Sequence, residues 1–235
     1  EALARVLAAL PENAGKVVVV DGIFSMGGDI APLAEMIPVC QKYEARLMVD
    51  DAHSVGVLGG GRGTAAELGV TEGVDLIMGT FSKSFASLGG FIAGDAEVID
   101  YIQHHARSLI FSASIPPANT AAAMAALEVM QEEPERIARL NEIGAFMRRR
   151  YTELGFNIGQ SQTPIIPIII KDDDKTLKFW KALFDAGVYT NAVVPPAVPP
   201  NMSLLRTSYI ASHTDEQLEK VLATFEQVGK ALDVI

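Results

Sequence analysis

The sequence predicts an α/β fold in which a largely parallel sheet is followed by a small α+β domain. In the first part of the chain, short apolar runs typical of strands alternate with segments of helical period. The strand-like runs are Val17–Val20, Leu47–Val49 and Asp75–Met78, and the helix-period segments are Leu33–Tyr43 and Ala65–Leu68. Such alternation indicates βαβ units, whose ligand-binding groups lie at the carboxyl ends of the strands.

Further local signals extend this pattern toward the middle of the chain. Gly89–Gly94 is predicted to be a strand, and Asp95 is predicted to cap the helix that follows it. The pair Pro116-Pro117 is typical of a helix start, so we expect a helix over residues 118–130. Pro134 cannot continue that helix and is expected to end it.

The change in pattern after this proline predicts a domain boundary. We assign residues 1–132 to part of the large domain and residues 133–235 to the small C-terminal domain. The expected elements of the small domain are a helix through Arg150, a strand over Ile165–Ile170, a helix over Thr176–Ala186, a strand over Leu204–Ser208 and a helix from Thr214.

Composition excludes several classes of protein. A chain of 235 residues with 49% hydrophobic residues can bury a sizeable core, and a net charge of −10 argues against nucleic acid or anionic membrane as the main partner. The single cysteine, Cys40, cannot form an internal disulfide, which fits a reducing, cytoplasmic compartment. Neither a transmembrane run nor a signal peptide is visible. Because the chain begins at Glu1 inside an amphipathic pattern, we expect it to be the later part of a longer protein.

Lys83 is the residue with the most informative surroundings. It lies among small hydroxylated residues after a predicted strand, and Asp50 and His53 follow the strand before it. A lysine can form an imine with an aromatic aldehyde, and a carboxylate can keep a pyridine nitrogen protonated. Hydroxyl and backbone N–H groups can bind a phosphate. The combination predicts a site for an aromatic aldehyde cofactor, and no metal site is expected.

Five segments spread along the chain carry a family signature. They are Asp21–Met26, Val49–Gly56, Gly79–Ser84, Phe111–Ser114 and Leu204–Arg206. Over essentially the whole chain, the sequence resembles the α-oxoamine synthase family of pyridoxal-phosphate enzymes. The resemblance implies an aspartate-aminotransferase-like fold, pyridoxal 5'-phosphate (PLP) as the cofactor, and a homodimer with shared active sites. It also implies that a preceding part of the chain would supply a histidine that stacks on the cofactor ring.

Within this family, three segments are most similar to those of the bacterial serine palmitoyltransferase subfamily. They are Ile77–Ser84, Arg107–Ser114 and Val194–Pro199. This similarity implies a decarboxylative condensation of L-serine with palmitoyl-CoA that gives 3-ketosphinganine, the first step of sphingolipid synthesis. The alternatives are the sister enzymes 8-amino-7-oxononanoate synthase and 2-amino-3-ketobutyrate CoA ligase. Val194 stands where some relatives carry an arginine, so that position offers no second group for a carboxylate.

The resemblance assigns catalytic roles to three residues. Lys83 would hold the cofactor and later act as the base that takes the substrate α-proton. Asp50 would pair with the pyridine nitrogen. His53, with Ser25 beside it, would contact the phenolic oxygen of the cofactor. Without the resemblance, His53 and Ser25 would be interpreted as ordinary loop and turn residues.

Further residues are assigned to the phosphate and the substrate. Thr80 and Ser82 would bind the cofactor phosphate, although ordinary loop hydrogen bonding is the alternative. Ser112 would serve the phosphate of the neighbouring subunit, unless it merely ends a strand. Arg206 would bind the carboxylate of the amino acid, because an unpaired charge within a strand is costly; a structural ion pair is the alternative.

Two competing interpretations remain open at this point. Asp51 is the rival of Asp50 for the pyridine nitrogen, but side chains alternate along a strand, and the family pattern Asp-x-Ala-His selects Asp50. The segment Gly61–Ala66 matches the Gly-x-Gly-x-x-Ala fingerprint of a nicotinamide dinucleotide-binding module. Because the loop before Gly61 is too long for the tight turn of that motif, a flexible glycine loop is the favoured interpretation.

Overall fold

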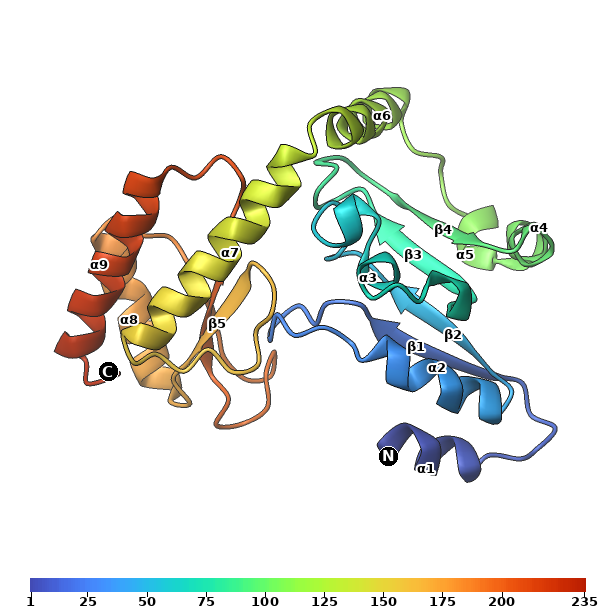
Figure 1. Cartoon of the computed structure of the whole chain (residues 1–235), viewed down its shortest axis with the longest axis horizontal. Helices are drawn as coiled ribbons and strands as arrows, with labels where there is room; N and C mark the ends of the chain where they lie inside the picture. Colours follow the sequence, from blue (N-terminus) through green and yellow to red (C-terminus); the bar gives the residue numbers. More distant parts are fainter. The chain divides into compact units, whose positions relative to one another are not determined.

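The computed structural model describes residues 1–235 and consists of two compact units (Figure 1). The first comprises Glu1–Ile23 and Ala31–Ile137, and the second comprises Phe24–Ile30 and Ala138–Ile235. The expected boundary between residues 132 and 133 differs from this division. The difference arises because helix α7 (Glu135–Glu153) begins in the first unit and continues in the second.

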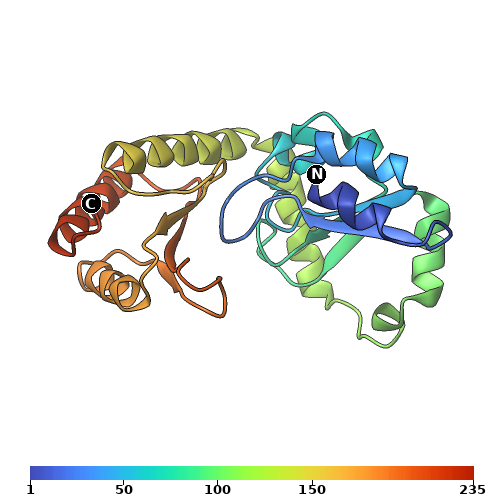
Figure 2. The ribbon, with the colours of Figure 1, turned by 90° about the horizontal axis from the view of Figure 1, so that it is seen from below.

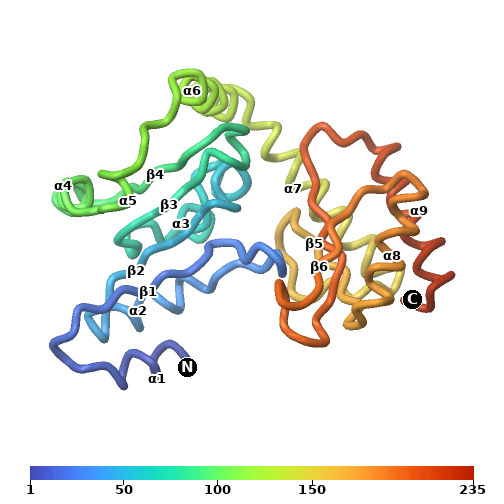
Figure 3. Tube along the Cα trace, turned by 180° about the vertical axis from the view of Figure 1, so that it is seen from behind, coloured from blue at the N-terminus to red at the C-terminus, as the bar shows by residue number.

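The segment 24–30 belongs to the second unit because its backbone bonds to residues far along the chain. The carbonyl oxygen of Gly28 accepts hydrogen bonds from Gln162 N at 3.0 Å and from Thr163 Oγ1 at 2.9 Å. The backbone N–H of Ile30 donates to Gln162 Oε1 at 3.3 Å. In Figure 3, this segment is part of the blue loop that connects β1 to α2.

The first unit contains a four-stranded sheet in the order β1-β2-β3-β4. Its strands are β1 (Lys16–Asp21), β2 (Ala45–Asp50), β3 (Leu76–Thr80) and β4 (Gly90–Gly94). The first three strands run parallel, as the βαβ pattern predicts, whereas β4 pairs antiparallel with β3. The register aligns Asp21 with Asp50 and Asp50 with Met78, so β1 and β2 end level while β3 continues to Thr80 at the same edge of the sheet.

Six helices accompany this sheet. They are α1 (Ala2–Ala8), α2 (Leu33–Lys42), α3 (Thr64–Glu67), α4 (Ala96–His105), α5 (Arg107–Ile110) and α6 (Pro117–Glu132). The buried side chains of α2 form one core with Leu47 and Val49 of β2; they are Leu33, Ile37 and Cys40. Helix α6 packs separately, through Ala123, near Phe85.

Most of these elements match the sequence prediction, with shifted ends. Asp95 occupies the N-cap position of α4 as expected, but its side chain makes no capping hydrogen bond. The short helix α5 is not predicted by the sequence, and it shows that Ser112 follows a helix and not a strand. A four-residue helix leaves little periodicity to detect.

The second unit is a three-stranded antiparallel sheet with helices on one side (Figure 2). Its strands, in the order β5-β7-β6, are β5 (Ile165–Ile169), β7 (Leu204–Ser208) and β6 (Asn191–Val193). The helices are α7, α8 (Asp173–Asp185) and α9 (Asp215–Ala231). Only β6 is missing from the sequence prediction, since it has three residues and is followed by Pro195-Pro196. None of the helices in either unit combines the length and apolar composition needed to cross a membrane.

An aromatic core holds the helices of the second unit against the sheet. Tyr151, Phe179 and Phe225 are each 0% exposed, and the ring centroids of Phe179 and Phe225 are 5.6 Å apart. Leu205 of β7 is also 0% exposed and belongs to the same core. Burial of several aromatic side chains contributes a large hydrophobic stabilisation to the second unit. This packing holds β7, and the residues on it, in place.

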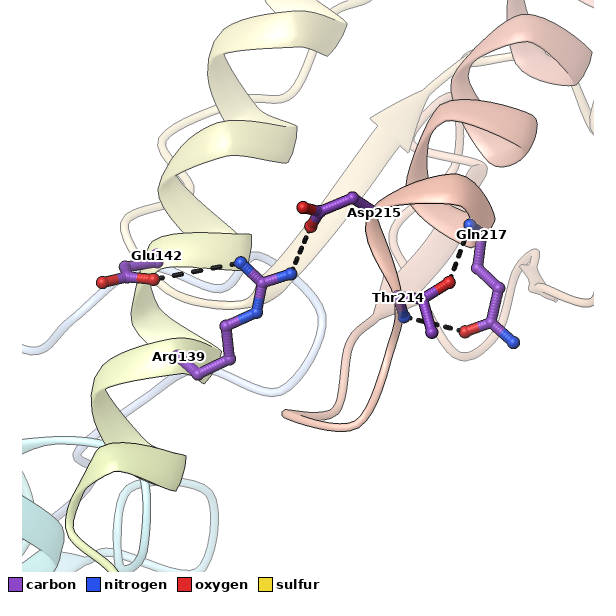
Figure 4. A network of polar contacts seen from close by, with 5 residues as sticks. All are labelled: Arg139, Glu142, Thr214, Asp215 and Gln217. Atoms are coloured by element: carbon purple, nitrogen blue, oxygen red, sulfur yellow. Dashed lines mark hydrogen bonds and ion pairs between the residues drawn. The ribbon is translucent and has the colours of Figure 1, made fainter.

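Helix α9 begins with a complete capping box (Figure 4). Thr214 Oγ1 accepts from Gln217 N at 3.3 Å, and Gln217 Oε1 accepts from Thr214 N at 2.9 Å. Next to the cap, Asp215 pairs with Arg139 of α7, which also lies 3.9 Å from Glu142. The reciprocal bonds satisfy backbone N–H groups that a helix start otherwise leaves unpaired.

We predict that Thr214→Ala destabilises the second unit by about 1 kcal/mol, because it removes this cap. Thr224→Ala is the matched control, since Thr224 lies inside α9 and its hydroxyl donates to Lys220 O. Urea unfolding of the full-length protein, together with amide exchange at Gln217, measures both effects. Equal stability losses in the two variants would contradict the capping role.

Candidate active site

Asp50 and Lys83 lie at the same edge of the first unit's sheet. Asp50 is the last residue of β2, and Lys83 follows the end of β3. The Asp50 side chain is half-buried, and its Oδ1 accepts a hydrogen bond from Ala52 N at 2.9 Å. Lys83 is exposed. The structure therefore brings a carboxylate and a primary amine to the carboxyl ends of neighbouring parallel strands.

Asp21 is a third charged group at this edge, to which the sequence analysis gives no role. It ends β1 and stands opposite Asp50 in the register. Partial burial raises the pKa of Asp21, the negative charge of Asp50 raises it further, and the Lys83 ammonium lowers it. The three groups thus interact electrostatically. The sequence signal that could have identified Asp21 is its position directly after the valine run of β1.

His53 is carried by a turn that begins directly after β2. The carbonyl oxygen of Asp51 accepts from Ser54 N at 2.9 Å and from Val55 N at 3.0 Å, which closes the turn around His53. The His53 side chain is half-buried. This turn places His53 at the sheet edge that also carries Asp50.

Asp50 and its rival Asp51 differ sharply in environment. Asp51 is 0% exposed, and its Oδ2 accepts from Thr64 N at 3.0 Å. Burial raises the pKa of Asp51, while the polar groups of Ser54 and Thr64 act in the opposite direction. A carboxylate enclosed in this way cannot reach a ligand, so the geometry favours Asp50 as the ligand-facing group.

The hydroxyls of Thr80 and Ser82 meet at the start of the loop that carries Lys83. Their Oγ atoms are 2.8 Å apart, and Ser82 N donates to Thr80 Oγ1 at 3.2 Å. Thr80 Oγ1 also lies 3.1 Å from Gly89 O, to which it donates. The two hydroxyls and this backbone N–H are hydrogen-bonded to one another and to Gly89 O, so they would donate to a phosphate only by exchanging these partners.

Ser112 lies in a different setting from these hydroxyls. It follows α5, is exposed, and donates its hydroxyl to Ser108 O of the same helix. The residues before it are unusually exposed for apolar side chains: Leu109 is 54%, Ile110 51% and Phe111 79% exposed. A run of this kind is typical of a surface that another chain covers.

Ser25 and Arg206 belong to the second unit, where they contact each other. Arg206 Nε donates to Ser25 O at 2.6 Å. Arg206 lies in β7, its side chain is half-buried, and burial lowers its pKa. It takes part in none of the ion pairs of the structure, so a backbone oxygen and not a carboxylate holds it.

The glycine-rich segment Gly61–Ala66 does not form the tight strand-to-helix turn of a dinucleotide-binding motif. Strand β2 ends at Asp50, and the helix that follows the segment, α3, has only four residues. Gly63 is buried against the carboxylate of Asp51. The segment therefore has a packing role inside the first unit.

The known proteins that this chain resembles include relatives with different activities. The chain is 51% identical to a serine palmitoyltransferase from Sphingobacterium spiritivorum over 94% of its length, and that match covers 57% of the relative. It is 43% identical to an 8-amino-7-oxononanoate synthase from Thermosipho melanesiensis, again over 94% of this chain and 56% of the relative. The chain thus spans little more than half the length of the curated relatives that it matches.

The comparison with solved structures and family models agrees with these relatives. A serine palmitoyltransferase variant from S. paucimobilis with a bound PLP–myriocin aldimine superposes with a TM-score of 0.95 at 35% identity, covering 99% of this chain and 59% of that one. The predicted fold class is confirmed. The family model for aminotransferase class I and II matches residues 1–225. The chain belongs to the aminotransferase class I and II family.

Proposed function

We propose that the full-length protein is a PLP-dependent acyltransferase that condenses L-serine with palmitoyl-CoA, giving 3-ketosphinganine, carbon dioxide and free coenzyme A. The observation that carries the proposal is the 51% identity to a serine palmitoyltransferase, against 43% to an 8-amino-7-oxononanoate synthase. The product would enter sphingolipid synthesis. A sister reaction, with another amino acid or acyl-CoA, is the second candidate, because its enzymes match over the same share of the chain.

The residues of the first unit fit PLP by their chemistry. Lys83 supplies the amine for covalent attachment, and Asp50 supplies a carboxylate for the ring nitrogen. Thr80 and Ser82, whose hydroxyls are hydrogen-bonded to each other at 2.8 Å, would turn these hydroxyls to the phosphate. His53, with Ser25, is assigned to the phenolic oxygen. When bound, PLP accepts the electrons that remain after the α-proton of an amino acid is removed.

Each side chain then has one task in the reaction. Lys83 takes the α-proton of the amino acid and later returns a proton to the product carbon. The Asp50 carboxylate would pair with the ring nitrogen and so keep that nitrogen protonated. Arg206 binds and orients the amino-acid carboxylate before it leaves as carbon dioxide. Its guanidinium suits this task because it remains charged when partly buried.

We further propose that two copies of the chain share their active sites. The apolar run of Leu109, Ile110 and Phe111 supports this, since its exposure leaves an area that a second copy would cover. Ser112 adjoins the run and would donate its hydroxyl to the cofactor phosphate of the partner. The cytoplasmic location expected from the sequence stays a prediction.

We predict that the purified full-length protein is yellow and releases carbon dioxide with L-serine and palmitoyl-CoA. Glycine, alanine and shorter acyl-CoAs, tested in parallel, identify a sister reaction if one of them reacts faster. Lys83→Ala should abolish turnover and the borohydride-reducible link to PLP, because no other amine is assigned to the cofactor. Lys42→Ala, on the exposed end of α2, is the control and should keep both. A colourless wild-type protein that instead binds a nicotinamide dinucleotide would refute the proposed class.

We predict that Arg206→Lys weakens L-serine binding by about 1–3 kcal/mol, because an ammonium cannot make the two-point contact of a guanidinium. Retention of PLP should change little. Arg148→Lys is a matched control, since Arg148 is also half-buried in the second unit and donates to a backbone oxygen, that of Thr163, at 2.7 Å. Spectroscopic titration with serine measures the affinity. If Arg206→Lys altered only the affinity for acyl-CoA, the assignment would be wrong.

We predict that Ser112→Asp inactivates the homodimer by repelling the partner's phosphate. Mixing full-length Lys83→Ala and Ser112→Asp chains should restore activity, because in the heterodimer one site carries both lesions and the other carries neither. Ser114→Asp is the control for a charge added to the same exposed segment. Verified subunit exchange without any recovered activity would mean that Ser112 does not act across the interface.

A further inference from the structure

Asp51 stands out because it is the one buried carboxylate of the chain. Of the 29 acidic residues, it alone is fully enclosed, at 0% exposure. Burying a carboxylate is costly unless its oxygens find partners. Neither the cofactor roles nor the substrate role assigned above uses this side chain, so its position needs another explanation.

The carboxylate fits between two backbone segments that have no side chain to oppose it. A Cβ atom on Gly22 would lie 2.1 Å from Asp51 Oδ1, and one on Gly63 would lie 2.1 Å from Oδ2. Between these glycines, Oδ2 accepts from Thr64 N at 3.0 Å. The side chain therefore connects the residue after β1 to the first residue of α3.

Two buried hydroxyls complete this enclosure. Thr64 Oγ1 donates to Ser54 Oγ at 2.7 Å, and both residues are 0% exposed. Oδ1 of Asp51 accepts no hydrogen bond itself. The contact that fixes the carboxylate is therefore the bond to Thr64 N, together with the close packing on both glycines.

The same residue determines the backbone around the assigned cofactor groups. Asp51 N donates to Met78 O at 2.8 Å, which attaches the end of β2 to β3. Asp51 O accepts from Ser54 N and Val55 N, and so forms the turn that carries His53. Asp50, the preceding residue, points to the other side of the strand.

We propose that Asp51 is a positioning residue. Its carboxylate fixes the turn of residues 51–55 to Gly22 and Thr64, and thereby orients Asp50 and His53 toward the cofactor without touching it. The inference rests on the proposed function, because that function assigns Asp50 and His53 to PLP. The required property of Asp51 is an acceptor oxygen of the right reach, which an asparagine also has.

The test compares Asp51→Ala and Asp51→Asn in the full-length protein. Asp51→Ala should weaken PLP binding by about 10-fold or more, the loss typical of removing groups that orient metal ligands, and should alter the pH dependence of the bound PLP absorbance. Amide exchange at Ser54, Val55 and Thr64 should accelerate. Asp51→Asn should behave like the wild type in all three measurements.

Asp75→Ala is the matched control for loss of a structural carboxylate. Asp75 Oδ2 accepts from Leu47 N at 2.8 Å, a bond of the same kind elsewhere on β2. This variant should accelerate exchange at Leu47 and leave PLP affinity and absorbance unchanged. An equal loss of PLP affinity in both alanine variants would mean that general destabilisation, and not positioning, is being measured.

Three further outcomes of these experiments would overturn the proposal. The first is Asp51→Ala with accelerated exchange but wild-type PLP affinity and absorbance. The second is a folded Asp51→Asn that has lost PLP binding, since charge and not geometry would then matter. The third is unchanged exchange at Ser54 and Val55 in Asp51→Ala, a result that is independent of PLP. A wild-type protein that binds no PLP would refute the proposed function, while the exchange data would still decide whether Asp51 fixes the turn.

If Asp51→Ala fails to fold, Gly63→Ala replaces it. The three atoms nearest to the added methyl group all belong to Asp51, with Oδ2 at 2.1 Å, and the φ of +98° at this position adds backbone strain. It should displace the carboxylate and reduce PLP affinity as Asp51→Ala would. Wild-type PLP affinity in a folded Gly63→Ala whose Thr64 amide exchanges faster would contradict the positioning role.

Discussion

The candidate site depends on backbone hydrogen bonds between the parallel strands that continue past the ends of β1 and β2. Gly22 N donates to Asp50 O at 2.8 Å, and Asp51 N donates to Met78 O at 2.8 Å. These two bonds fix the register in which Asp50 and Asp51 leave β2. Because side chains alternate along a strand, a slip by one residue would exchange their environments and bury the wrong carboxylate.

The sequence predicts most of this edge because the signals that define it are local. Alternating apolar runs identify the strands, and the polar residues that matter directly follow those runs. The pattern therefore predicts that Asp50 and Lys83 lie at one edge of the sheet. Asp21 ends a strand in the same way, but its role becomes visible only when the register places it opposite Asp50.

Other features cannot be predicted locally because they arise from contacts between distant residues. The excursion of residues 24–30 into the second unit depends on Gly28 O, whose partner Thr163 Oγ1 is 135 residues away in sequence. From the sequence alone, that segment resembles an ordinary connection between a strand and a helix. The assignment of residues 24–30 to the second unit therefore cannot be predicted from their local sequence.

The glycines around Asp51 show that close packing can explain why a sequence motif contains glycine. Gly63 belongs to a segment that the sequence presents as a flexible loop, yet it is buried and has a φ of +98°. A side chain there would be strained and would also meet the Asp51 carboxylate. The physical requirement is thus close approach to a buried oxygen, and not flexibility.

Arg206 in the second unit is likewise oriented by a single backbone contact. Its Nε is used by Ser25 O, whereas the two Nη groups have donors suited to a planar carboxylate. One backbone hydrogen bond orients the guanidinium but leaves its positive charge in place. A structural ion pair would neutralise that charge. The charge of Arg206 therefore remains available, and its burial makes an anionic ligand the natural partner, because a half-buried cation without one is costly. This argument favours substrate binding over a structural role for Arg206.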